Sequence, residues 1–156
     1  MNVPRRSRPR FGPHYGISTD PEGMLDWTWA EDRLTGSRNY WITTTGEDGA
    51  PAAAPVWGVW FEGAVYFGTN PKSLKARNLA RDPRVVIHLE SGDEVVILYG
   101  EMERDTLPPD ALDAYDAKYS YRPTVTEGWF VLRPRRAVAW VERDFPRTAT
   151  RFDFAG

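Results

Sequence analysis

The residues best suited to chemistry by type and spacing lie between positions 66 and 83, in the segment YFGTNPKSLKARNLARDP. An apolar strand is followed there by a Thr-Asn-Pro turn at 69–71 and by a short helix that begins at Ser73. Free backbone N–H groups and the helix dipole favour an anion at such a helix start. Three cations surround it: Lys72, Lys75 and Arg77. The segment therefore predicts a phosphate-binding site.

The same segment is also typical of an ordinary capped helix. Ser73 is a common N-cap residue, and Pro83 ends a helix because it lacks a backbone N–H. Ala76, Leu79 and Ala80 follow the i, i+3, i+4 spacing of a buried stripe. Basic residues on the outer face of such a helix are usually only solvated, so this segment leaves both interpretations open.

Length and composition predict one domain with a weak overall charge. The chain has 156 residues and a formal net charge of -2, so it has no general attraction to nucleic acid or to anionic membranes. It has no cysteine and no apolar run of signal-peptide or membrane-span length. We therefore expect a cytoplasmic protein without a membrane span.

Basic residues are concentrated near the N-terminus, in a segment that contains little apolar surface. They are Arg5, Arg6, Arg8 and Arg10. We predict a flexible basic leader over residues 1–19 and a single domain over residues 20–156. Arginines without interleaved aromatic residues favour a solvated tail or a strap across a partner subunit over a nucleic-acid arm.

No catalytic residue or metal site is indicated by the remaining chemistry. Only His14 and His88 are histidines, a poor supply for a Ser-His-Asp hydrolase or a metal centre. His88 lies in a predicted strand, where a lone histidine is more often packed and hydrogen-bonded than catalytic. Asp110, Asp113 and Asp116 recur every three residues and fit the solvated face of a helix better than a metal cage.

The pattern of apolar residues predicts mostly strands. Alternating or β-branched runs predict them over residues 40–45, 51–61, 64–69, 84–90 and 95–102, and over residues 129–132 and 137–141, a last run broken or bulged at Arg133-Pro134. Helical spacing predicts helices over residues 73–82 and 109–119. A capping box at residues 28–31 predicts a further helix with Trp27, Ala30 and Leu34 on one face.

These elements predict a mainly β fold, a six-stranded antiparallel β-barrel with two to three short helices. A barrel of this size fills its interior with side chains, so a nucleotide-sized ligand would lie in an outer groove or at a subunit contact. Trp57 and Trp60 are three residues apart in the predicted strand 51–61, so strand alternation sends them to opposite faces. One can join the core, and the other lies half exposed or is covered by a second subunit or a planar ligand.

Three segments of the chain, taken together, resemble a known family. They are NYWITTTGEDGAPAAAPVWGVW, GAVYFGTNPKSLKARNLARDPRVVIHL and GDEVVILYGEMER. They resemble the pyridoxamine 5'-phosphate oxidase-like split β-barrel flavoproteins, which include a deazaflavin-dependent branch that uses coenzyme F420. The resemblance implies the FMN-binding split-barrel fold and a homodimer with two equivalent cofactor sites at the subunit interface.

The resemblance also implies which residues hold the cofactor phosphate. Thr69 and Asn70 match the turn on the phosphate side, Ser73 matches the helix-opening serine, and Lys75 matches the phosphate-binding lysine. Leu74 departs from the pattern, since the pyridoxamine phosphate oxidases place an arginine there. Residues 52–56 depart from it too, because they are apolar where the flavin-binding oxidases supply basic residues.

Arg77 and Asn78 resemble the deazaflavin-dependent branch, whose cofactor carries a phosphate and an acidic tail. F420 is therefore favoured, with FMN as the alternative. By this resemblance the cofactor ring lies against Pro55, Val56 and Trp57, and hydride passes between the cofactor and a planar small-molecule substrate. Two alternatives stay open: a non-catalytic flavin- or haem-binding storage protein on the same barrel, and an interaction module that presents the arginine leader to a partner.

Overall fold

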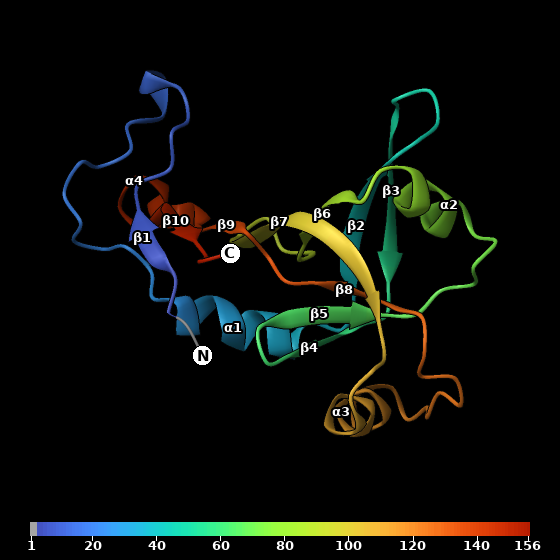
Figure 1. The fold of residues 1–156 in the computed structure, drawn as a ribbon. Helices are drawn as coiled ribbons and strands as arrows, with labels where there is room; N and C mark the ends of the chain where they lie inside the picture. The colour runs from blue at the N-terminus through green and yellow to red at the C-terminus, as the bar shows by residue number, and fades with distance from the viewer. Residues whose placement is uncertain (1–2) are drawn as a thin grey trace.

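The computed structural model describes residues 3–156, which form ten β-strands, four α-helices and two 3-10 helices (Figure 1). The helices are η1 (Pro13–Tyr15), α1 (Trp27–Gly36), α2 (Leu74–Arg81), α3 (Pro109–Tyr119), η2 (Glu142–Asp144) and α4 (Phe145–Thr148). The strands are β1 (Arg5–Ser7), β2 (Tyr40–Thr45), β3 (Pro51–Val56), β4 (Val59–Phe61), β5 (Ala64–Phe67), β6 (Arg84–His88), β7 (Glu94–Asp105), β8 (Trp129–Leu132), β9 (Arg136–Val141) and β10 (Thr150–Asp153). Residues 1 and 2 of the predicted leader lie outside the described residues. Within residues 3–156, no helix combines the length and the apolar character that crossing a membrane requires.

One long strand joins the two parts of the sheet. Strand β7 pairs with β6 and β9 along its first part and with β8 through residues 102–105. The barrel wall follows the antiparallel order β4-β5-β8-β7-β6-β2-β3, and β3 and β4 are consecutive in the chain. Strands β9, β10 and β1 continue the sheet beyond β7. The architecture is a mainly β, antiparallel split β-barrel, which is the fold class that the sequence predicts.

The predicted number of six strands is too low. The predicted strand 51–61 is two strands, because the chain leaves the β3 ladder at Trp57 and Gly58 before β4 begins. Gly58 lies so close to β5 that a Cβ there would be 2.9 Å from the carbonyl oxygen of Tyr66. Its N–H donates to the hydroxyl of Tyr119 at 2.9 Å rather than to a neighbouring strand. β1 and β10, near the ends of the chain, are further strands that the sequence pattern does not indicate.

Helix α1 begins earlier than the predicted capping box. Its N-cap is Asp26, which makes no side-chain capping hydrogen bond, so the box predicted at residues 28–31 is wrong. The carboxylate of Glu31 instead accepts a hydrogen bond from Trp60 Nε1 at 3.3 Å, which links the helix to β4. The apolar face predicted for this helix is confirmed, because Trp27, Ala30 and Leu34 are buried.

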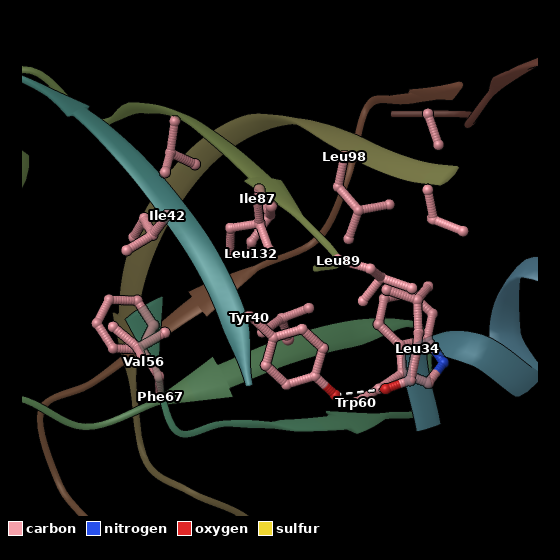
Figure 2. Packing of buried hydrophobic residues seen from close by; sticks show 14 of the residues in the cluster. Leu34, Tyr40, Ile42, Val56, Trp60, Phe67, Ile87, Leu89, Leu98 and Leu132 are labelled. Carbon is pink, nitrogen blue, oxygen red and sulfur yellow. Dashed lines mark hydrogen bonds between the residues drawn. The ribbon is translucent and has the colours of Figure 1, made fainter. Parts of the chain in front are cut away.

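Side chains fill the interior of the barrel. Its fully buried members include Tyr40, Phe67, Ile87 and Leu98, which come from four different strands (Figure 2). The Tyr40 hydroxyl donates to the carbonyl of Leu34, which ties β2 to the end of α1 (Figure 2). A second, smaller cluster packs α3 against the opposite face of β4, β5 and β8. A nucleotide-sized ligand must therefore lie outside the barrel.

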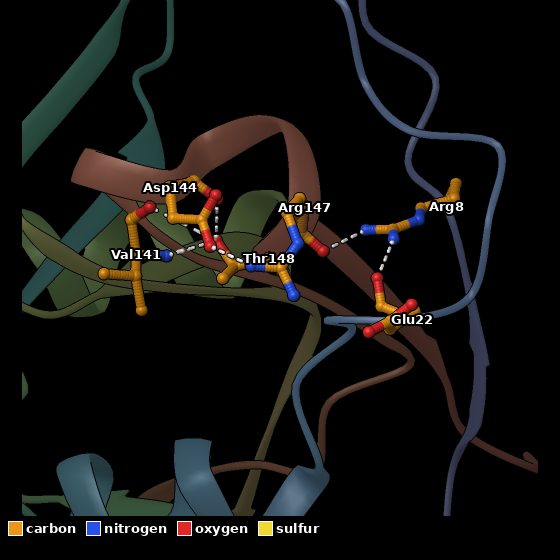
Figure 3. A network of polar contacts seen from close by, with 6 residues as sticks. All are labelled: Arg8, Glu22, Val141, Asp144, Arg147 and Thr148. Carbon is orange, nitrogen blue, oxygen red and sulfur yellow. Dashed lines mark hydrogen bonds and ion pairs between the residues drawn. The ribbon is translucent and has the colours of Figure 1, made fainter.

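Part of the predicted leader is a strand that pairs with the end of the chain. β1 pairs with β10 in antiparallel register. The Arg8 guanidinium donates to four backbone carbonyls. Figure 3 shows it beside Glu22 and Arg147, which carry two of them. The four acceptors belong to Asp20, Glu22, Arg147 and Ala149. We call these hydrogen bonds of Arg8 the Arg8 clamp. Composition does not indicate it, because backbone carbonyls are present at every residue and carry no sequence signal.

We expect Arg8→Ala to lower the free energy of unfolding by about 2 kcal/mol, because four carbonyls lose a charged donor. Arg10→Ala is the matched control, since Arg10 is an exposed arginine of the same segment. Urea unfolding followed by tryptophan fluorescence measures both variants. Equal unfolding midpoints for the two variants would contradict the clamp.

Candidate functional site

The turn between β5 and α2 is held by side-chain hydrogen bonds. Ser73 is the N-cap of α2, and its Oγ accepts from the N–H of Ala76 at 3.2 Å. The Thr69 hydroxyl donates to the same Oγ at 3.1 Å, and Asn70 Oδ1 accepts from the N–H of Lys72 at 2.8 Å. Thr69, Asn70 and Ser73, which the sequence proposes as site residues, therefore lie together in one turn.

The start of α2 carries positive charge that no acidic side chain compensates. Lys72 and Arg77 are exposed and Lys75 is half-buried. Within residues 3–156, none of the eleven ion pairs involves these three cations. In the same described part of the chain, no group accepts from the backbone N–H of Leu74 or Lys75. We call residues 69–77 the basic turn, and its cations and free N–H groups can bind an anion.

Two uncharged residues of α2, Asn78 and Leu74, differ from each other in burial. The Asn78 side chain is fully buried, and its Nδ2 donates to Thr44 Oγ1 at 3.0 Å. Its Oδ1 accepts from the Arg81 guanidinium at 3.2 Å. In this structure Asn78 thus ties α2 to β2. Leu74, where the oxidases place an arginine, is 53% exposed.

The second group of proposed site residues lies at the end of β3. Pro55 is exposed, and Val56 is buried in the barrel core together with Phe67, the last residue of β5 (Figure 2). β3 and β5 therefore end against the same part of the core. The chain continues from β3 to Trp57 and from β5 to the basic turn.

The two tryptophans lie in different environments as predicted, although the break in the chain at residues 57 and 58, rather than alternation along one strand, separates them. Trp60 is buried in the core, whereas Trp57 is 42% exposed. One face of the Trp57 ring is stacked on Tyr119 of the same chain, with ring centroids 4.3 Å apart and an interplanar angle of 2°. Arg38 lies over both rings. Of the alternatives given by the sequence, the half-exposed tryptophan is the one observed, and Tyr119 of α3 covers one face of its ring.

A lysine of α3 holds the corner between β3 and β4. Lys118 Nζ donates to the carbonyl of Gly58 at 2.8 Å and to the Tyr40 hydroxyl at 3.3 Å. Burial, and secondly the positive charge of Arg38, lower the pKa of Lys118 to about 8. No sequence pattern singles out Lys118, because a lysine in the last turn of a predicted helix is usually solvated. Only its contact with residues 40 and 58 gives it this environment.

A cavity of about 620 Å³ adjoins the basic turn. The turn contributes Thr69 and Pro71 to its wall, and Gly68, directly before the turn, also lines it. The other walls are α3 and the segment that follows it, which lie below β5 in Figure 1, and the β7 residue Arg104. A Cβ at position 68 would lie 3.0 Å from the Trp129 ring, so a glycine is needed for this close approach. No motif in the sequence indicates this cavity, because its walls come from four distant segments.

The other residues with candidate chemistry are engaged in structural contacts. His88 Nδ1 lies 2.7 Å from the Leu89 carbonyl oxygen. The His88 ring is parallel to the Trp41 ring, with ring centroids 6.5 Å apart. Asp113 and Asp116 both pair with Arg122. Among residues 3–156 no group of three or more histidine and acidic side chains is arranged to hold a metal ion.

Comparison with known proteins identifies the family. The family described as pyridoxamine 5'-phosphate oxidase matches residues 30–144, well over half of the chain. The chain belongs to the pyridoxamine 5'-phosphate oxidase family. The match spans the basic turn, the β3–β4 corner and the cavity, and it confirms the resemblance seen in the sequence. No protein of curated function matches the chain.

Solved structures include relatives with the same fold. A conserved hypothetical protein from Mycobacterium tuberculosis is 27% identical with a TM-score of 0.63, over 76% of this chain and 86% of that one. A heme binding protein from Mycobacterium smegmatis is 25% identical with a TM-score of 0.56, over 71% of this chain and 52% of that one. An F420 reductase is 17% identical with a TM-score of 0.52, over 80% of this chain and 93% of that one, and at this identity it shows the fold alone.

The lowered pKa of Lys118 predicts a specific pH dependence of stability. The ordinary pKa of 10.5 applies in the unfolded chain, so between about pH 8 and 10.5 the unfolded state binds more protons than the folded state. The Lys118 contribution to the free energy of unfolding therefore rises with pH across this window. Above pH 10 two tyrosines lower the free energy of unfolding as the pH rises. Burial raises the pKa values of Tyr40 and Tyr115 in the folded protein, so there the folded state binds more protons than the unfolded state.

Urea unfolding at a series of pH values tests this prediction. Lys118→Met should remove the rise in stability between about pH 8 and 10, whereas Lys72→Met, at an exposed lysine, should keep it. A Lys118→Met variant with the same pH slope as the parent protein would contradict the prediction.

Proposed function

We propose that this protein is an oxidoreductase that uses F420 or FMN and transfers hydride between the bound cofactor and a planar small-molecule substrate. The observation that carries the proposal is the basic turn, whose three cations have no acidic partner among the described residues. The family match gives this turn a chemical context.

The residues of the basic turn fit a cofactor phosphate. Lys75 and Arg77 supply positive charge, and the free N–H groups at the start of α2 supply donors aimed along the helix axis. Thr69, Asn70 and Ser73 shape the turn through hydrogen bonds of their own. Asn78 would act indirectly, because its buried bond to Thr44 fixes α2 on the barrel.

The end of β3 would hold the ring of the cofactor. Pro55 and Trp57 present exposed apolar surface there, while Val56 anchors the strand in the core. When bound, a flavin or deazaflavin supplies the hydride chemistry. The chain's own part is to bind the phosphate, orient the ring and exclude water with apolar side chains.

The residues of the site favour F420 over FMN. Leu74 replaces the arginine of the oxidases, and residues 52–54 of β3 are alanines that offer no cation. Arg77 and Lys72 are both exposed, so the basic turn presents charge beyond what a single phosphate uses. An acidic cofactor tail would use this additional charge.

A second candidate function is non-catalytic binding of a flavin or haem. The observation that favours it is the 25% identity to a heme binding protein, of which the matched region covers about half. Turnover separates the two candidates. Reoxidation of bound, reduced cofactor by a quinone, enone or tetrapyrrole acceptor supports the enzyme, and failure with all three classes supports storage.

A homodimer with cofactor sites at the interface is part of this proposal. The outer face of the sheet formed by β2, β6 and β7 carries large apolar side chains beside Thr43 and His88, where an antiparallel sheet facing water is usually polar. Its half-buried residues include Trp41, Val86, Ile97 and Tyr99, which the strand register places in adjacent rows. Covering this face with a second copy would remove apolar surface from water and bring two sites together.

We expect Lys75→Ala to weaken cofactor binding by about 1 to 3 kcal/mol without unfolding the protein, because a charged donor to the phosphate is lost. Absorbance titrations with F420 and with FMN, at low salt, measure the dissociation constant and identify the preferred cofactor. Arg143→Ala is the control, since it removes an exposed cation in η2, outside the proposed cofactor site. An unchanged dissociation constant in Lys75→Ala would overturn the proposed phosphate site.

We expect Val86→Lys to convert the dimer to a monomer, because the interface would have to bury an unpaired charge. Sedimentation equilibrium measures the mass. Thr35→Lys, at an exposed position of α1, should leave the dimer intact. A monomeric parent protein, or a Val86→Lys variant of unchanged mass, would contradict the proposed interface.

A further inference from the structure

The cavity beside the basic turn has walls suited to a flat aromatic ring. Tyr115 and Trp129 both line it, with ring centroids 5.2 Å apart and planes at 87°. Both side chains are 6% exposed, and Trp129 Nε1 already donates to the Val125 carbonyl at 2.8 Å, so the indole offers the cavity no unused donor. Tyr121, which is 56% exposed, Pro123 and Val125 add further apolar lining.

The cavity also contains one cation held in a defined position. The Arg104 guanidinium lies 4.5 Å from the centre of the Phe130 ring and donates to the Gly128 carbonyl at 3.2 Å. Among the described residues it belongs to no ion pair, so its remaining N–H groups have no acidic acceptor. The planar guanidinium of an arginine in the wall of an aromatic-lined cavity matches the geometry of a carboxylate.

An acidic residue limits the negative charge of a ligand that this cavity can bind. Glu127 lines the same cavity and belongs to no ion pair of the described chain, although Arg104 also lines it. One arginine and one glutamate give the lining no net charge. A monoanion can pair with Arg104, whereas a dianion such as a phosphate monoester is repelled more strongly by Glu127.

We propose that this cavity binds an aromatic monocarboxylate, with its ring against Tyr115 and Trp129 and its carboxylate on Arg104. The volume of about 620 Å³ lies within the range of small-molecule sites. Thr69 belongs both to the cavity wall and to the basic turn, so the ligand lies next to the proposed cofactor phosphate site. The identification of this ligand as a substrate rests on the oxidoreductase function proposed above.

Calorimetric titration of the cofactor-free protein with three probes tests the cavity: 2-naphthoate, 2-naphthol and 2-naphthyl phosphate. We expect 2-naphthoate to bind most tightly of the three. Arg104→Gln should weaken 2-naphthoate at least about 10-fold and leave 2-naphthol unchanged, while Arg104→Lys, which keeps the charge without the planar fork, should weaken 2-naphthoate less than Arg104→Gln does. Arg143→Gln, at an exposed arginine of η2, should change none of the three affinities.

Glu127→Gln gives an independent readout, because it should strengthen 2-naphthyl phosphate more than 2-naphthoate. Equal 2-naphthoate affinity in the parent protein and in Arg104→Gln would overturn the proposal, as would tighter binding of 2-naphthyl phosphate than of 2-naphthoate to the parent protein. Lys75→Ala separates this site from the cofactor site. If Lys75→Ala still binds 2-naphthoate, the cavity is a separate site, whether or not the variant binds F420 or FMN. If Lys75→Ala no longer binds 2-naphthoate, the proposed site in the cavity is wrong.

Discussion

The corner at Gly58 is the contact on which the barrel depends. The path of paired strands ends at β3 on one side and at β4 on the other, and only residues 57 and 58 join these ends. A side chain at position 58 would collide with the β5 backbone, so the corner requires glycine. Its N–H and carbonyl have no strand partner, and Tyr119 and Lys118 of α3 satisfy them. The corner thus couples the closure of the barrel to the position of α3.

The basic turn can keep its charge uncompensated because α2 is anchored by other means. Ala76 and Leu79 bury one side of this eight-residue helix, and Asn78 adds a buried hydrogen bond to Thr44. These contacts hold the helix against the mutual repulsion of its cations. The charge therefore remains available to a ligand, and the geometry of the turn does not depend on the ligand being present.

Helix α3 contributes to three features that are separate in the sequence. It covers the outer side of β4, β5 and β8, it satisfies the Gly58 corner, and through Tyr115 it forms a wall of the cavity. Its polar face also carries the aspartates that pair with Arg122. One helix thus links the core, the barrel closure and the surface beside the basic turn, so the cavity and the barrel share one set of packing contacts.

The sequence by itself determined the antiparallel barrel class, the basic turn with its Ser73 cap, and the family. These features depend on strand alternation, capping and turn chemistry, which act over a few neighbouring residues. The tertiary structure alone decided the break at Gly58, the Arg8 clamp, the environment of Lys118 and the cavity around Arg104. Each of these joins segments far apart in the chain, such as Lys118 and Gly58, and the energies that select them come from burial and from backbone groups that carry no local signal.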